Sequence, residues 1–132
     1  MKTTRRNFLK SSALVLGMPT IIPAAVLGKN GAVAPSNRIV LGGIGIGPRG
    51  REDLKAFLSQ PDVQFVMDAD VQETRREVVR VMVNRHYNNQ DCLKTREMAE
   101  VLGRSDIDAV LIATGDRWHA VASILAAKAG KD

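Results

Sequence analysis

The sequence predicts an α/β fold, in which a parallel sheet of about three strands carries helices on its faces. Apolar runs occur at residues 38–44, 63–69 and 109–113, and such continuous runs are typical of strands buried on both faces of a parallel sheet. Helical spacing of apolar residues is found between them, at 49–59, 72–85 and 93–102, and again at 120–128. Strands that alternate with helices require right-handed crossover connections.

The first predicted strand leads into a glycine-rich turn, Gly-Ile-Gly-Pro-Arg-Gly, at residues 45–50. In this G-x-G-x-x-G pattern Gly45 would permit a tight turn, and Gly47 would let the backbone approach a pyrophosphate closely. Gly50 would let the next helix pack against the strand. Because a helix N-terminus presents free N–H groups and the positive end of its dipole, the turn with Pro48 and Arg49 is predicted to bind phosphates.

The second predicted strand ends at an acidic residue, Asp70, which lies 20 residues after Gly50. This is the spacing of a dinucleotide-binding βαβ unit of the Rossmann type, in which the carboxylate accepts hydrogen bonds from the adenosine ribose. NAD is favoured over NADP, since Asp70 would repel a 2′-phosphate. Arg75 and Arg76 either contact such a phosphate or belong to a solvated helix face.

Asp68 is unusual, because a carboxylate inside a buried strand is costly unless it is paired. Two interpretations are open: Asp68 lies near the exposed end of the strand, or it shares ribose binding with Asp70.

A second candidate binding segment follows the third predicted strand at residues 114–119. In an open α/β sheet, ligands bind beyond the carboxyl ends of the strands. Thr114 is therefore predicted to hydrogen-bond a phosphate or ribose. His119 either reaches the nicotinamide, where it can transfer a proton, or packs on the first turn of its helix. Trp118 is expected to pack on the cofactor side or against a partner domain, and Gly130 to end the last helix.

The charge of the chain does not indicate a nucleic-acid partner. The chain has 19 Lys and Arg against 14 Asp and Glu, but five of the bases and none of the acids lie in residues 1–34. The remainder therefore carries 14 of each and is formally neutral. With three Phe, one Tyr and one Trp, it also offers few aromatic rings for base stacking.

Residues 1–34 are predicted to be an export signal followed by a linker. Thr-Arg-Arg-Asn-Phe-Leu-Lys at residues 4–10 precedes a short apolar run and resembles the twin-arginine motif. A membrane-spanning helix is disfavoured, because Gly17, Pro19 and Pro23 interrupt the apolar segment. The expected partner is the twin-arginine translocation machinery, and the expected location is the periplasm or another extracytoplasmic compartment.

Other site chemistries find little support in the sequence. Cys92 is the only cysteine, so no internal disulfide can form. No cluster of His, Cys, Asp and Glu has metal-ligand spacing, and no nucleophile is accompanied by a base and an orienting group.

Three segments resemble the N-terminal domain of the glucose–fructose oxidoreductase/inositol dehydrogenase/MocA (Gfo/Idh/MocA) family: residues 38–50, 63–76 and 106–131. Ile-Ala-Thr-Gly-Asp-Arg-Trp-His at residues 112–119 is similar to the third-strand motif of the family, which commonly has Pro where this chain has Gly115. The resemblance implies an NAD(P)-dependent oxidoreductase that transfers hydride between nicotinamide and a sugar or polyol. It also implies a homo-oligomer for the full-length protein.

The catalytic lysine of that family lies in a Glu-Lys-Pro motif, which would come after Asp132. The resemblance therefore implies that residues 35–132 are the N-terminal part of the dinucleotide-binding domain, that the substrate domain is absent, and that the chain is inactive alone. His119 is the one catalytic candidate within the chain. The alternatives are a truncated, non-catalytic nucleotide-binding fragment and an S-adenosylmethionine-dependent methyltransferase, which the 114–119 segment disfavours.

Overall fold

The computed structural model describes residues 33–132, so the predicted twin-arginine motif and most of the linker lie outside the described residues. The strands are β1 (Ile39–Ile44), β2 (Val63–Ala69), β3 (Leu93–Thr95) and β4 (Ala109–Ile112). The helices are α2 (Pro48–Leu58), α3 (Glu73–Tyr87), α4 (Met98–Leu102) and α5 (Asp116–Lys128), preceded by the short 3-10 turn η2 (Pro35–Asn37). Within residues 33–132, no helix combines the length and apolar character that membrane crossing requires.

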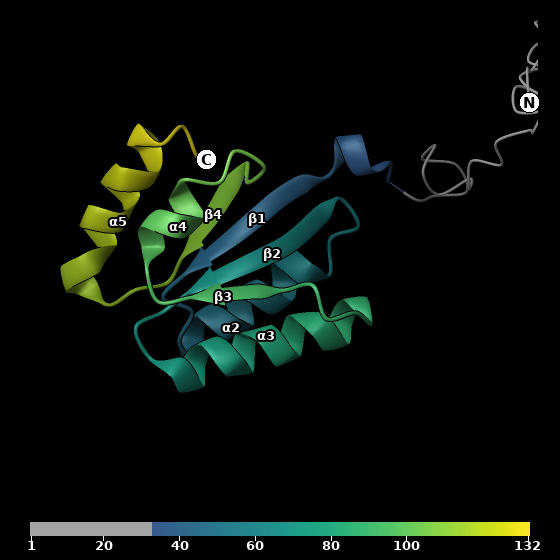
Figure 1. Ribbon diagram of the computed structural model, residues 1–132, viewed down its shortest axis with the longest axis horizontal. Helices are drawn as coiled ribbons and strands as arrows, with labels where there is room; N and C mark the ends of the chain where they lie inside the picture. Colours follow the sequence, from purple (N-terminus) through teal and green to yellow (C-terminus); the bar gives the residue numbers. More distant parts are fainter. Residues whose placement is uncertain (1–32) are drawn as a thin grey trace, which may run out of the picture.

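The four strands form one parallel sheet in the order β3-β2-β1-β4. Helices α2 and α3 cover one face, and α4 and α5 cover the other (Figure 1). This three-layer arrangement confirms the predicted Rossmann-type fold. All four strands run in the same direction, so their carboxyl ends meet at one edge of the sheet.

The predicted number of about three strands is wrong, because β3 adds a fourth at the edge of the sheet beside β2. Residues 93–102 were expected to form one helix, but Leu93–Thr95 pairs with Met67–Ala69 and only Met98–Leu102 is helical. A strand of three residues is too short to show an alternating pattern. The Thr95 hydroxyl accepts a hydrogen bond from the Glu97 N–H and thereby turns the chain from β3 into α4.

The last helix also differs from the prediction at its start. It begins at Asp116 instead of Ala120, so His119 lies in its first turn. Its end agrees with the prediction, because Gly130 has a φ of +70°. The N–H groups of Gly130 and Lys131 bond the carbonyls of Ala127 and Ala126, which is the glycine-dependent Schellman arrangement.

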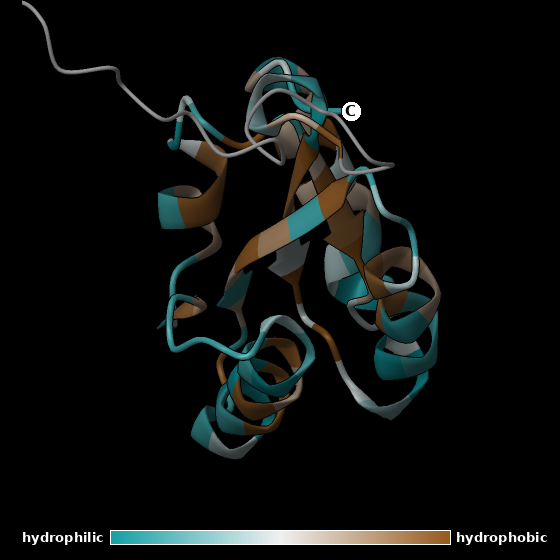
Figure 2. Cartoon of the chain, turned by 90° about the vertical axis from the view of Figure 1, so that its right-hand side faces the viewer, coloured by the Kyte–Doolittle hydropathy of each residue, from teal (hydrophilic) through white to brown (hydrophobic). Residues whose placement is uncertain are grey.

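The core is divided by the sheet into two apolar clusters, and Figure 2 shows hydrophobic colour on the strands between the helical layers. The cluster under α2 and α3 contains Leu41, Ile46, Leu54, Leu58, Phe65, Val79, Val83 and Cys92. The cluster under α4 and α5 contains Ile44, Met67, Ala69, Val101, Leu102, Ile107, Ala122 and Ala126. Each layer of helices therefore buries its own apolar stripe against one face of the sheet.

A β-bulge in β2 decides which face its acidic residues occupy. Leu41 pairs with Phe65 but Gly42 pairs with Met67, so Val66 is the extra residue. Val66 and Met67 consequently both lie against the cluster under α4 and α5. Beyond them, each side chain of β2 lies on the opposite face of the sheet from the one it would occupy without the bulge. Asp68 thereby lies on the α2/α3 side, beside Phe65 and Ile46.

Candidate functional site

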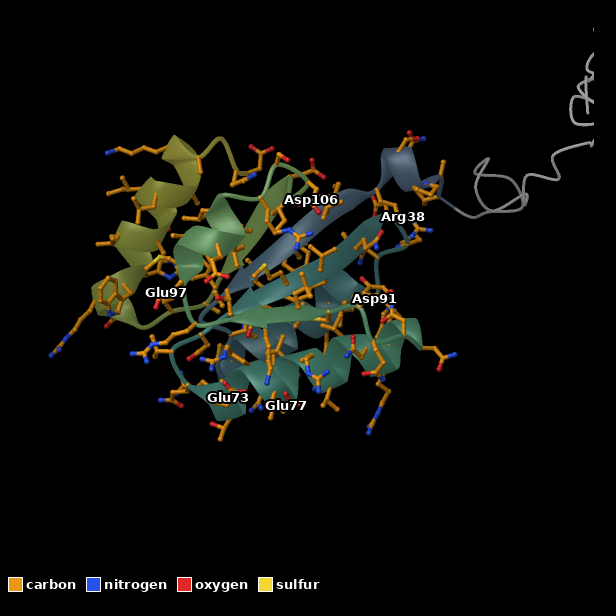
Figure 3. The ribbon with its side chains drawn as sticks, in the orientation of Figure 1. Arg38, Glu73, Glu77, Asp91, Glu97 and Asp106 are labelled. Atoms are coloured by element: carbon orange, nitrogen blue, oxygen red, sulfur yellow. The ribbon has the colours of Figure 1, made fainter. Side chains whose placement is uncertain are left out.

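A cavity of about 390 Å³ opens at the carboxyl ends of the strands. It is bounded by residues that follow each of the four strands: Gly45 after β1, Asp70 after β2, Arg96 after β3 and Thr114 after β4. Glu97, at the start of α4 and labelled in Figure 3, lies on its wall. The cavity occupies the position at which open α/β sheets bind their ligands.

Two glycines of the turn have different roles: Gly45 lines this cavity, and Gly47 does not line it but begins the next helix. Gly45 has a φ of +70°, and a Cβ built there would lie 2.4 Å from Cγ2 of Thr114. Both the backbone conformation and the close contact therefore require glycine. Gly47 is the N-cap of the 11-residue helix α2 and offers no side chain to cap it. Pro48 has no N–H, and the Arg51 N–H bonds the carbonyl of Gly47, so the N–H groups of Arg49 and Gly50 remain available to a ligand.

Gly50 has the packing role that the sequence predicts. It lies in the first turn of α2, where a Cβ would come within 2.5 Å of the Ala113 side chain beyond β4. The absent side chain lets α2 lie directly over the end of the sheet.

The carboxylate of Asp70 is buried at the rim, with 3% of its side chain exposed. Its Oδ1 accepts a hydrogen bond of 2.8 Å from the backbone N–H of Gln72, and its Oδ2 lies 3.8 Å from Nη1 of Arg75. The backbone N–H of Gly45 donates to the carbonyl of Ala69, at 2.7 Å. Asp70 is thus fixed next to the glycine turn, where a ribose-binding carboxylate belongs.

Thr114 contributes an unsatisfied polar atom. Its hydroxyl is buried and has no hydrogen-bond partner among the described residues, although it lies at the cavity. A buried hydroxyl without a partner costs free energy, so a ligand that supplied a hydrogen bond here would be stabilised.

The adjacent arginines of α3 have different environments. Arg76 is 9% exposed and its guanidinium donates to the backbone carbonyl of Asp70 and to the carboxylate of Glu73. Arg76 therefore holds the β2–α3 connection together. Arg75 lies at the cavity wall with 42% of its side chain exposed.

Asp68 does not belong to the cavity. It is 0% exposed, and neither carboxylate oxygen has a hydrogen-bond partner among the described residues. The expectation that it lies near an exposed strand end is therefore wrong, and it makes no hydrogen bond to Asp70 or to another described residue that lines the cavity. Burial, together with the nearby charge of Asp70, raises the pKa of Asp68 to about 7. Burial, followed by the charge of Asp68, raises the pKa of Cys92 to about 12.

The structure brings only part of the predicted site to the cavity. Gly45, Asp70 and Thr114 line it. Pro48 is exposed at the start of α2, and the Arg49 side chain is 86% exposed and pairs with Asp53. His119 is exposed on α5, where its N–H and carbonyl are both used within the helix, and it does not line the cavity.

Sequence reasoning missed the wall formed by Arg96, Glu97 and Met98. The signal that would reveal it is the short strand β3, since residues that follow a strand lie at the carboxyl edge of a parallel sheet. Trp118, expected on the cofactor side, also lines the cavity, with 58% of the residue exposed.

The described residues fit a dinucleotide better than a metal ion. A tight glycine turn, a carboxylate and an unpaired hydroxyl line one cavity, and the uncapped N-terminus of α2 begins at its N-cap Gly47, two residues after Gly45. Within residues 33–132, no three His, Cys, Asp or Glu side chains are placed to share a metal ion.

Comparison with curated proteins identifies sugar-related relatives that are longer than this chain. The glycosyl hydrolase family 109 protein 1 of Shewanella sp. (strain MR-4) is 30% identical over 145 residues, covering 96% of this chain and 32% of the relative. The alpha-N-acetylgalactosaminidase of Shewanella oneidensis is 30% identical over 149 residues, with the same coverage of 96% and 32%. The chain thus spans about a third of the length of these relatives. No family profile matches it.

Comparison with solved structures confirms the fold. A putative myo-inositol dehydrogenase from Sinorhizobium meliloti has a TM-score of 0.59 and 29% identity, covering 70% of this chain and 26% of that one. The scyllo-inositol dehydrogenase from Lactobacillus casei, solved with NAD(H) and scyllo-inositol, has a TM-score of 0.60 at 18% identity, covering 71% and 26%. A putative NADPH-dependent oxidoreductase from Desulfitobacterium hafniense has a TM-score of 0.61 at 24% identity, covering 72% and 25%. This chain is therefore similar to the nucleotide-binding part of oxidoreductases.

Proposed function

We propose that the chain binds NAD at the cavity and is the coenzyme-binding part of an exported oxidoreductase acting on a sugar or polyol. The observation that carries this proposal is the meeting of Gly45, Asp70 and Thr114 around one cavity, at the carboxyl ends of three parallel strands. The names of the similar structures, which include inositol dehydrogenases, support the substrate class. The twin-arginine pattern of residues 4–10 supports export.

Each residue has a separate task in this proposal. The first N–H groups of α2 would hold the pyrophosphate, Asp70 would accept hydrogen bonds from the adenosine ribose, and Thr114 would donate to or accept from the coenzyme with its unpaired hydroxyl. Bound nicotinamide supplies hydride transfer. In this proposal the chain's own contribution is to bind and orient the coenzyme.

Calorimetric titration of the full chain with NAD tests this proposal. We expect binding, and we expect Asp70→Ala to weaken it by about 1–3 kcal/mol, which is the contribution of a charged hydrogen bond. Asp70→Asn tests the charge separately, since an amide oxygen can still accept from Gln72. Asp62→Ala is the control, because Asp62 is an exposed acid in the turn before β2. Absence of NAD binding, or equal affinities for all the variants, would contradict the proposal.

The names of the curated relatives favour a second candidate, part of a glycosyl hydrolase, because 30% identity extends over 96% of this chain. The two candidates differ in the products that the full-length protein would form. With a polyol, an oxidoreductase would accumulate reduced coenzyme that is detected by its absorbance. With an aryl N-acetylgalactosaminide, a hydrolase would release the aglycone while the amount of NAD stayed constant.

A further inference from the structure

The cavity carries a positive group beside the negative one at the end of β2. Arg75 is the third residue of α3, and its Nη1 atom lies 3.8 Å from Oδ2 of Asp70. The same nitrogen lies 3.6 Å from the position that a Cβ on Gly47 would occupy. The guanidinium therefore lies between the glycine turn and the ribose-binding carboxylate.

Arg75 is held in place by its backbone, while its side chain remains available. Its N–H bonds the carbonyl of Gln72, which fixes the first turn of α3 beside the end of β2. Within residues 33–132 its guanidinium makes an ion pair with Asp70 but no hydrogen bond of normal length. Most of its five N–H donors are consequently free for a ligand.

Two other arginines near this point show that the feature is specific to Arg75. The guanidinium of Arg76 already donates hydrogen bonds to the carbonyl of Asp70 and to the carboxylate of Glu73. Arg96 lines the opposite wall, but its side chain is 73% exposed and its Nε atom is 4.0 Å from Glu97. Of these three, Arg75 alone combines cavity exposure with direct contact to the ribose-binding acid.

We infer that Arg75 determines cofactor preference at this cavity. By compensating the charge of Asp70, it lets the cavity accept a coenzyme with a 2′-phosphate as well as one with a 2′-hydroxyl. This inference rests on the proposed function. The reason is electrostatic: an unpaired Asp70 would repel the phosphate, whereas the adjacent guanidinium can turn from the carboxylate toward the phosphate and bind it in a bidentate manner. It revises the expectation from sequence that Asp70 favours NAD over NADP.

The test is calorimetric titration of the full chain and its variants with both NAD and NADP. For the unmodified chain we expect the two dissociation constants to lie within about tenfold of each other. Arg75→Ala should weaken NADP binding by at least about tenfold, the contribution of one charge-assisted contact, and change NAD binding by less than about threefold. Arg75→Lys keeps the charge but lacks the planar guanidinium. Its affinity for NADP should lie between that of the unmodified chain and that of Arg75→Ala.

Arg80→Ala is the matched control. Arg80 lies on the same helix but is not in this cavity, and its guanidinium pairs with Glu77, a residue labelled in Figure 3. Its removal should leave the NAD-to-NADP ratio unchanged. Equal weakening of both nucleotides by Arg75→Ala, or no change in either, would overturn the inference while leaving NAD binding established. If the unmodified chain binds neither nucleotide, the proposed function fails together with it.

Discussion

Asp68 and Asp70 lie two residues apart on the same side of the sheet, and the fold treats them differently. Asp70 follows the last residue of β2, where the chain leaves the sheet, and it has the Gln72 N–H and the Arg75 guanidinium as neighbours. Asp68 lies inside β2, between β1 and β3, with both oxygens unpaired. One carboxylate is stabilised and faces a cavity, and the other is buried at a cost.

The comparison shows that the local backbone, more than burial, decides whether an acid is stabilised. Both residues are less than 10% exposed, at 0% and 6%. The strand end offers the Gln72 N–H, which is not used in the sheet, and Asp70 accepts a hydrogen bond of 2.8 Å from it. Inside the strand, a Cβ on Gly43 would come within 2.9 Å of Oδ1 of Asp68, so there is no space for a compensating group on that side.

The largest effect that we predict is a stabilisation by Asp68→Val at pH 8. Valine would place apolar atoms beside Phe65 and Ile46 in place of a charge. The pKa of Asp68 is raised from 3.8 to about 7. At about 1.4 kcal/mol for each pKa unit, the ionised carboxylate costs the folded chain about 4 kcal/mol. We therefore expect the free energy of unfolding in urea to rise by about 2–4 kcal/mol.

Asp62→Val is the control for this substitution, because it removes an exposed acid just before the same strand and should change stability by less than about 0.5 kcal/mol. A loss of stability on Asp68→Val would mean that the carboxylate has a stabilising partner, and the contrast with Asp70 would then disappear.

The second prediction concerns pH. The folded chain binds the Asp68 proton more tightly than the unfolded chain, so the free energy of unfolding should fall as pH rises, by up to about 1.4 kcal/mol per pH unit below pH 7. The groups around Asp68 are Asp70, Arg76 and Cys92, and Cys92, with a pKa of about 12, does not titrate in this range.

The measurement is urea unfolding from pH 5 to pH 8 for the unmodified chain and for Asp68→Asn. The surface acids whose pKa is lowered by ion pairs, Glu52, Glu73, Glu77 and Asp106, are present in both proteins, so their contribution to the pH dependence cancels. The difference between the two proteins therefore reports Asp68. Parallel curves would show that its carboxyl group stays ionised throughout.

The features that the sequence predicts correctly are those encoded within a few neighbouring residues. The apolar runs of β1, β2 and β4 identify the strands, and the glycine pattern identifies the turn because Gly45 and Gly50 act through contacts at the end of the same sheet. Asp70 is found at the carboxyl edge, as its spacing from Gly50 predicts.

The features that the sequence does not predict depend on contacts between distant segments. Residues 93–95 form a strand because β2 offers its edge to them, and their own pattern contains no strand signal. The bulge at Val66 reverses the alternation of β2, and a one-residue change of register moves every later side chain to the other face. The sequence leaves two interpretations of Arg75 open, because the approach of α3 to the glycine turn is a contact that no spacing in the sequence encodes.

The smallest predicted effect returns to Asp70 and has the opposite sign to that at Asp68. Asp70→Ala should lower the free energy of unfolding by about 1 kcal/mol, because the Gln72 N–H loses its acceptor at the start of α3. Asp70→Asn should cost only a few tenths of a kcal/mol, since the amide oxygen can accept the same hydrogen bond. Urea unfolding at pH 8 without nucleotide measures both. If Asp70→Ala stabilised the fold as Asp68→Val is expected to do, the carboxylate at the strand end would be an uncompensated charge too, and the distinction between the two positions would be lost.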